Sequence, residues 1–272
     1  MKKLLLPVLS LLCFAASAQH QLEKIWSTDT IVAVPESVLP DLKKGILYVS
    51  LIDGGPWDAD GKGGVAKLSI DGKKYDGNWV TGLNAPKGLG MYGNRLYAAD
   101  ISDVVVINLS NGKVEKKIAV PGATGLNDIT VTDDGVVFVS DSKTARVWRI
   151  ENDNPVLFLE NMNGANGLKA IGKDLYILSG KNFVKADAQK NVSKVVDLDQ
   201  AGDGLEPVGN GDFIATSWVG YIYYVHSDGK VETLLDTHAE KKNTADIGFD
   251  PVKKIVYVPT FNGKTIVAYQ LK

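Results

Sequence analysis

Short runs of apolar residues, bounded by glycine, asparagine and aspartate, recur along the whole chain after residue 20. No stretch beyond that point repeats apolar residues at helical spacing over three turns, whereas many runs are rich in valine, isoleucine, leucine and tyrosine. Runs of this kind with turn residues between them are typical of β-strands. The pattern therefore predicts an all-β fold.

Dipeptides that favour tight turns separate many of these runs. Two-residue hairpin loops need backbone conformations that asparagine, aspartate and glycine tolerate best. We therefore expect antiparallel meanders with hairpin turns at Asp71-Gly72, Asn111-Gly112, Asp134-Gly135, Asn210-Gly211, Asp228-Gly229 and Asn262-Gly263.

One strand-like segment returns six times, at intervals of 38 to 49 residues. Its copies cover residues 46–50, 96–100, 137–141, 175–179, 213–217 and 256–260. A four-stranded propeller blade occupies about this length of chain, so residues 19–272 are predicted to form a single six-bladed β-propeller with antiparallel blades around a central channel. Residues 22–26 are expected to pair with the last blade, which would leave no exposed sheet edge. The alternative is an array of two β-sandwich domains.

The N-terminal segment has the features of an export signal. Lys2 and Lys3 precede an apolar run, and Ala16-Ser17-Ala18 is a small-residue cleavage pattern, so residues 1–18 are predicted to be a cleaved signal peptide. The run is shorter than the roughly 20 apolar residues that span a bilayer, which favours cleavage over a membrane anchor. Cys13 is the only cysteine, so the mature chain would form no disulfide. We expect a monomer, either periplasmic or secreted, that does not insert into membranes.

Charge bears on the class of partner. Lysine and arginine total 30 against 32 acidic residues, a formal charge of −2. A protein that binds nucleic acid needs a basic excess to neutralise phosphates. Nucleic acid is therefore not an expected partner.

A second short element precedes each strand-like segment by about eight to twelve residues, and it carries the candidate chemistry. The innermost strands of a propeller line its central channel, so residues at equivalent positions of the six repeats surround the channel at the same depth. That ring is predicted to contain Glu36, Lys87, Asn127, Asn166, Asp203, and either Ala245 or Asp246.

Two carboxylates and two amides in this ring, on Glu36, Asn127, Asn166 and Asp203, offer hard oxygen donors. Such donors suit Ca²⁺, with Mg²⁺ or Mn²⁺ as alternatives, far better than zinc. An equally weighted alternative is that these side chains only satisfy backbone groups in local turns. Trp57, Trp79 and Trp218 flank glycine-rich loops and are candidates for a pocket wall or for ordinary packing.

The repeat order over residues 30 to 271 resembles the gluconolactonase/senescence-marker-protein (regucalcin) family of six-bladed propellers, which is similar to diisopropylfluorophosphatases and paraoxonase-type lactonases. Three segments carry the resemblance: Leu126-Asn127-Asp128, Ala165-Asn166-Gly167-Leu168 and Gly202-Asp203-Gly204-Leu205. It implies that Glu36, Asn166 and Asp203 are metal ligands, and that Asp203 is also the general base. Asn127 would face the substrate.

These observations predict an exported, metal-dependent lactonase-like hydrolase that acts on a small ester or lactone, with Lys87 and Asn127 beside the substrate. The chain departs from the family at Gly125, where sugar-lactone members have an arginine, and at Ser37-Val38, where many members have Gly-Pro. The missing arginine favours the alternative, a non-catalytic propeller similar to NHL-repeat proteins that binds a protein, peptide or glycan.

Overall fold

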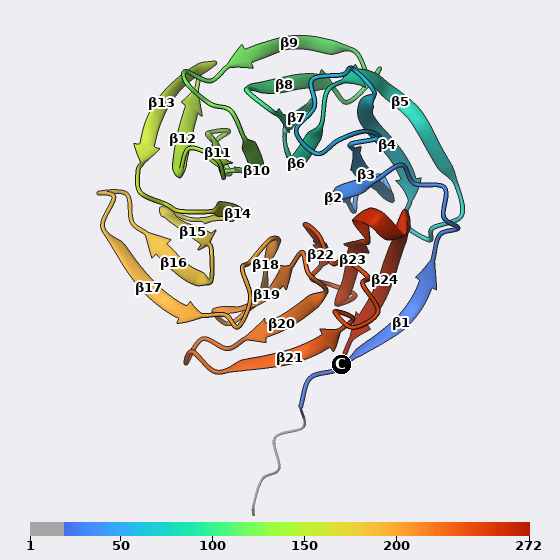
Figure 1. The fold of residues 1–272 in the computed structure, drawn as a ribbon, viewed down its shortest axis with the longest axis vertical. Coiled ribbons are helices and arrows are strands. Elements are labelled where there is room, and N and C mark those ends of the chain that lie inside the picture. Colours follow the sequence, from blue (N-terminus) through green and yellow to red (C-terminus); the bar gives the residue numbers. More distant parts are fainter. Residues whose placement is uncertain (1–18) are drawn as a thin grey trace, which may run out of the picture.

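The computed structural model describes residues 19–272, and these form six four-stranded antiparallel sheets arranged in a ring (Figure 1). The predicted signal peptide, residues 1–18, lies outside the described residues. The all-β class and the six-bladed propeller expected from the sequence are confirmed. The two-sandwich alternative is wrong, because the six sheets surround one axis.

Each of the first five blades is built from four consecutive strands. Blade 1 contains β2 (Pro35–Asp41), β3 (Ile46–Leu51), β4 (Gly63–Ser69) and β5 (Tyr75–Leu83). Blade 2 contains β6 (Pro86–Tyr92), β7 (Arg95–Asp100), β8 (Asp103–Asn108) and β9 (Val114–Ala119). Blade 3 contains β10 (Leu126–Val131), β11 (Val137–Asp141), β12 (Arg146–Glu151) and β13 (Asn154–Leu159).

Blade 4 contains β14 (Ala165–Ile171), β15 (Asp174–Ser179), β16 (Asn182–Ala186) and β17 (Val192–Asp197). Blade 5 contains β18 (Leu205–Gly209), β19 (Asp212–Ser217), β20 (Tyr221–Val225) and β21 (Val231–Asp236). Blade 6 contains β22 (Gly248–Asp250), β23 (Ile255–Pro259), β24 (Ile266–Leu271) and, as its outermost strand, β1 (Leu22–Ser27). In every blade, the recurring strand-like segment is the second strand from the axis.

Pairing of β1 with β24 closes the ring, as expected from the sequence. The register runs from Leu22 opposite Leu271 to Ser27 opposite Val267, with one irregularity at Ile25. The outermost strand of the last blade therefore comes from the first described residues. This pairing also covers the edge of β24, which would otherwise present unpaired backbone groups.

The hydrophobic core is divided among the blade interfaces. Six buried clusters lie between neighbouring blades, and each draws side chains from two of them. Between blades 2 and 3, for example, Val104 and Val106 pack with Val139 and Trp148. Alternate residues of each strand therefore face the neighbouring blades, which explains the valine-rich and isoleucine-rich strands of the sequence.

All six predicted turn dipeptides lie in connections between adjacent antiparallel strands of one blade, and at Asn210-Gly211 the connection is two residues long. Asn262-Gly263 lies in the connection between β23 and β24. These residues belong to a short 3-10 turn, η1 (Phe261–Gly263), and Lys264 adopts the left-handed conformation at its end. Thr260 hydroxyl and backbone groups bond across this turn to Thr265, which stabilises the longer connection.

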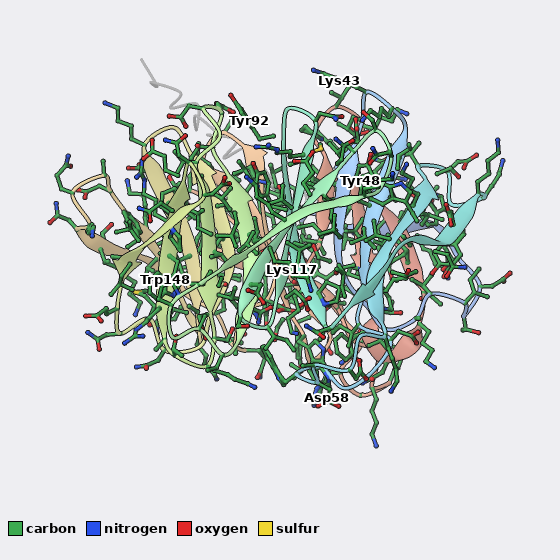
Figure 2. The ribbon with its side chains drawn as sticks, turned by 90° about the horizontal axis from the view of Figure 1, so that it is seen from above. Lys43, Tyr48, Asp58, Tyr92, Lys117 and Trp148 are labelled. Carbon is green, nitrogen blue, oxygen red and sulfur yellow. The ribbon has the colours of Figure 1, made fainter. Side chains whose placement is uncertain are left out.

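The channel has two different ends (Figure 2). One face carries the loop that contains Asp58 and is called the loop face; the opposite face carries Lys43 and Tyr92 and is called the turn face. The inner strands begin at the loop face, so the first residues of β2, β6, β10 and β14 lie at that end of the channel. Among residues 19–272, no helix is long and apolar enough to cross a membrane.

Candidate functional site

The predicted ring residues lie at matching places in five blades. Glu36, Lys87, Asn127 and Asn166 each follow the first residue of an inner strand, where the pairing register with the second strand shifts. Asp203 occupies the same place just before β18. Asn166 is partly exposed, and the other four are buried. The irregular register aims these side chains toward the axis rather than into the blade interfaces.

The sixth place in the ring belongs to Ala245, which settles the choice that the sequence left open. Asp246 lies one residue deeper, where it forms a parallel bridge with Ser37. The Ser37 hydroxyl donates to the Asp246 carboxylate over 2.5 Å, and the Asp246 amide donates to the Glu36 carbonyl over 2.9 Å. The ring of candidate ligands therefore has five polar members and one apolar one.

Four oxygen atoms of this ring are buried and have no hydrogen-bond partner. Within residues 19–272, eight buried side-chain atoms lack a partner, and half of them are Glu36 Oε2, Asn127 Oδ1, Asn166 Oδ1 and Asp203 Oδ2. A buried polar atom without a partner costs about 1 to 3 kcal/mol, so four such atoms in one ring point to a ligand that is positive or donates hydrogen bonds. The residues present therefore fit a hard divalent cation.

Hydrogen bonds fix how the two amides present their oxygens. The Asn127 amide nitrogen donates to the Ser142 hydroxyl over 2.9 Å, and that hydroxyl donates to the Ala165 carbonyl over 2.5 Å. The Asn166 amide nitrogen donates to Asp203 Oδ1 over 2.5 Å. Because the nitrogens are engaged, both amide oxygens are left free for a ligand in the channel.

Lys87 lies in the ring but turns its ammonium toward the loop face. Its Nζ donates to the carbonyls of Pro56 and Ala85 and lies 4.0 Å from the centre of the Trp57 ring. The ammonium of Lys143 lies 4.3 Å from the centre of the same ring. Two ammonium groups therefore contact the Trp57 ring at the mouth of the channel. The sequence did not indicate that Lys143 would be one of them.

The stem of Lys143 covers Gly125. A Cβ at Gly125 would lie 2.6 Å from the Lys143 Cγ, so a larger residue at this position would displace the lysine side chain.

Burial dominates the electrostatics of the ring. It raises the pKa of Asp203 to about 7, although the Asn166 hydrogen bond and the Lys87 charge both favour the ionised form. Burial also raises the pKa of Glu36, and the neighbouring Asp203 charge raises it further. The pKa of Lys87 is lowered by burial, against the attraction of Glu36. The protein thus keeps carboxyl groups together that repel one another in their ionised forms.

A second acidic layer lies just below the ring, and the sequence analysis missed most of it. Burial raises the pKa of Asp128 to about 7 and also raises that of Asp246. Asp128 accepts hydrogen bonds from the backbone amides of Ile129 and Leu168, which ties blade 3 to blade 4. The available signal was position, because Asp128 directly follows a ring residue.

From the turn face, a cavity of about 280 Å³ reaches this second layer. Its wall includes Asp128, Asp246, Thr130 and Met91, together with the ion pair between Lys169 and Glu206. The cavity leads toward the acidic layer from the side opposite Trp57.

The three tryptophans have different roles. Trp57 lies at the loop-face mouth with Lys87 and Lys143. Trp79 packs against Tyr48 with ring centres 5.1 Å apart, so it belongs to the packing between blades 1 and 2. Trp218 follows β19, contacts the edge of Phe261, and is 41% exposed.

No protein-family profile matches the chain, and no curated protein matches it. Solved structures of similar shape exist. A streptogramin B lyase structure superposes with a TM-score of 0.69 at 13% identity, and the match covers 93% of this chain and 98% of the lyase. A catalytically inactive virginiamycin B lyase from Staphylococcus aureus, solved with quinupristin, gives a TM-score of 0.67 at 15% identity over 93% and 100% of the two chains.

A chain of the nidogen/laminin complex also matches, with a TM-score of 0.67 at 13% identity, over 80% of this chain and 85% of that one. This chain is therefore similar in fold both to an enzyme and to a propeller solved in a complex of proteins. At such low identity, the similarity establishes the fold and does not select between the two kinds of function.

Proposed function

We propose that the protein is a divalent-cation-dependent hydrolase of small esters or lactones, with its site at the loop-face end of the central channel. The observation that carries this proposal is the set of four buried, unpartnered oxygens on Glu36, Asn127, Asn166 and Asp203. Carboxylate and amide oxygens are the donors that Ca²⁺ prefers, and Mg²⁺ or Mn²⁺ are alternatives. The cation ligands would be Glu36, Asn166 and Asp203.

When bound, the cation would polarise the carbonyl of the substrate and stabilise negative charge that develops on its oxygen. The protein's own groups would do the rest. Asp203 would accept the proton of the attacking water through Oδ2, which has no hydrogen-bond partner in the protein. Asn127 would orient the substrate through its free amide oxygen, and Lys87 would attract an acidic substrate group.

Asp203 has two tasks in this proposal, and they compete. Its Oδ1 accepts from Asn166, whereas Oδ2 has no partner, so one free oxygen must serve both as ligand and as base. A carboxylate that is bound to a cation is a weak base. Replacement of Asp203 is therefore expected to abolish cation binding and hydrolysis together rather than either one alone.

The test begins with chelator-treated protein. Its melting temperature is measured with Ca²⁺, Mg²⁺, Mn²⁺ or Zn²⁺ added back, and hydrolysis of a panel of lactones and aryl esters is measured under the same conditions. We expect Ca²⁺ to raise the melting temperature by mass action and to activate hydrolysis in the wild type. Neither effect should occur in Asp203→Asn, whereas both should persist in Asp197→Asn, an exposed carboxylate on blade 4. Absence of a shift with Ca²⁺, Mg²⁺ and Mn²⁺ would contradict the metal site in the channel.

The second candidate is a non-catalytic propeller that docks a protein, peptide or glycan on its loop face. Trp218 favours it, because a large aromatic side chain that is 41% exposed beside the channel mouth is typical of binding surfaces. The similarity in fold to the nidogen/laminin complex is compatible with this function. A cation that raises the melting temperature without hydrolysis of any substrate, together with weaker partner binding in Trp218→Ala, would support this candidate instead.

A further inference from the structure

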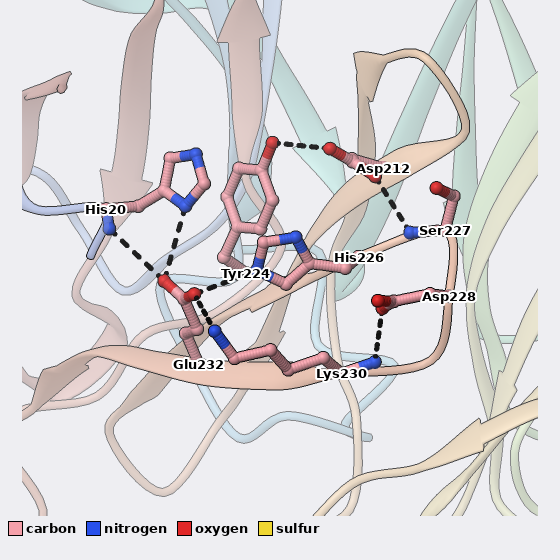
Figure 3. A network of polar contacts seen from close by, with 8 residues as sticks. All are labelled: His20, Asp212, Tyr224, His226, Ser227, Asp228, Lys230 and Glu232. Atoms are coloured by element: carbon pink, nitrogen blue, oxygen red, sulfur yellow. Dashed lines mark hydrogen bonds and ion pairs between the residues drawn. The ribbon is translucent and has the colours of Figure 1, made fainter. Parts of the chain in front are cut away.

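Away from the channel, two histidines and a glutamate meet at the outer edge of blade 5 (Figure 3). His20 lies just before β1, His226 follows β20, and Glu232 lies in β21. The ligand atoms of these three side chains all lie within 4.8 Å of one another. The fold therefore assembles this cluster from the first described residues and from a hairpin more than 200 positions later.

The carboxylate of Glu232 stands between the two imidazoles. Its Oε2 lies 3.2 Å from His20 Nδ1, and its Oε1 lies 2.9 Å from His226 Nε2. Lys230 Nζ also donates to Oε1, over 2.8 Å. Two imidazole nitrogens and a carboxylate group thus converge at one place.

Neighbouring groups hold the rings in this arrangement. Tyr224 stacks on His20, with ring centres 3.7 Å apart and planes 9° from parallel. The Tyr224 hydroxyl donates to Asp212 over 2.8 Å, and the Ser227 amide donates to the same carboxylate (Figure 3). The stack and the turn that carries His226 are therefore connected through Asp212, which limits the reorganisation that a bound ion would require.

Two imidazoles and one carboxylate form a ligand set that zinc binds tetrahedrally, with water as a fourth ligand. This set differs from the all-oxygen ring in the channel, which suits Ca²⁺. The side chains of His20 and His226 are 30% and 22% exposed, so an ion can reach them from solvent. Lys230 also contacts Glu232, but its side chain is 60% exposed and is free to turn into solvent when an ion arrives.

We propose that His20, His226 and Glu232 form a binding site for one Zn²⁺ ion. The ion would link the residue that precedes β1 to the β20–β21 hairpin. Since β1 belongs to blade 6 and the hairpin to blade 5, the ion would connect these two blades and so stabilise the closed ring. Zinc binding would therefore be coupled to the stability of the whole propeller.

The test uses purified protein without a polyhistidine tag, saturated with Ca²⁺, and titrated with Zn²⁺ by calorimetry. The wild type should bind one equivalent of Zn²⁺ and gain melting temperature. Binding should weaken at least tenfold in His20→Ala and in His226→Ala, because each loses one of three protein ligands. The matched control is His238→Ala, which removes the third histidine of the chain, outside the cluster, and should bind as the wild type does.

A further variant separates an ion site from a cluster that is only structural. Lys230→Met removes the ammonium that competes for Glu232, so zinc affinity should rise several-fold even though a hydrogen bond is lost. Two results would overturn the proposal: absence of zinc binding by the wild type, or equal affinity in His20→Ala, His226→Ala and the wild type. Each affinity is determined on protein shown to be folded, so destabilisation of a variant does not obscure the outcome.

Discussion

Replacement of Asp203 by asparagine should make the protein more stable without divalent cations and less stable with them. Asparagine has nearly the same shape as aspartate, and its Oδ1 could keep the hydrogen bond from Asn166. The change removes a buried charge that raises the pKa of Glu36. It also removes a carboxylate that the proposal assigns to the cation.

The magnitude follows from the pKa. The Asp203 carboxyl has a pKa of about 7 in the folded protein, against about 3.9 in an unfolded chain. At pH 8 the folded protein must keep this group ionised at a cost of up to about 4 kcal/mol, since each pKa unit corresponds to about 1.4 kcal/mol. The new amide hydrogens would lack partners and offset about 1 to 2 kcal/mol of this. We therefore expect Asp203→Asn to gain about 2 to 3 kcal/mol in the presence of chelator.

Urea denaturation of wild type and variant at pH 8 measures this difference, first with chelator and then with Ca²⁺. With chelator, Asp203→Asn should unfold at higher urea than the wild type. With Ca²⁺ the order should reverse, because only the wild type gains stability from binding. A variant that is less stable than the wild type in chelator would refute the argument that burial of this charge is costly.

Three further predictions follow from the described residues. In chelator, the wild type should become more stable as the pH falls from 7 toward 4. The pKa values of Asp128 and Asp203 are raised in the folded protein, so the folded chain binds more protons than the unfolded chain over this pH range. Urea denaturation at several pH values measures how the free energy of unfolding changes with pH. Gly88→Ala should destabilise the fold by about 2 to 4 kcal/mol, because its Cβ would lie 2.4 Å from the Asp128 Cα and backbone must move; a shift in urea midpoint below 0.5 M would contradict this. Deletion of residues 19–27 should lower the melting temperature strongly and promote association, measured by calorimetry and size-exclusion chromatography, because β24 would lose its partner strand.

Much of the fold was predictable because the repeat is a local property of the sequence. The second strand of each blade has a similar apolar run in all six copies, and turn residues separate the strands. These features depend on which side chains tolerate a pleated strand or a tight turn, so neighbouring residues suffice to read them. At Asn262-Gly263 the connection also contains a 3-10 turn, which hydrogen bonds between Thr260 and Thr265 stabilise.

The candidate site was predictable only in part. Equivalent positions of a propeller repeat lie at the same depth in the central channel. The sequence therefore placed five residues in one ring: Glu36, Lys87, Asn127, Asn166 and Asp203. It did not determine which oxygens lack partners, since this depends on the hydrogen bonds that engage the Asn127 and Asn166 nitrogens. Resemblance to a known family supplied the assigned roles, which remain predictions.

The sequence by itself thus determined the number of blades, the strands, and which position of each repeat belongs to the ring around the channel. All three follow from local side-chain preferences repeated along the chain. Only the tertiary structure decided that Ala245 rather than Asp246 completes the ring, and that Lys143 covers Gly125. It also brought His20 to His226 and Glu232. The physical reason is that these contacts join residues from different blades, whose relative depth and orientation are set by packing around the axis and by closure of the ring.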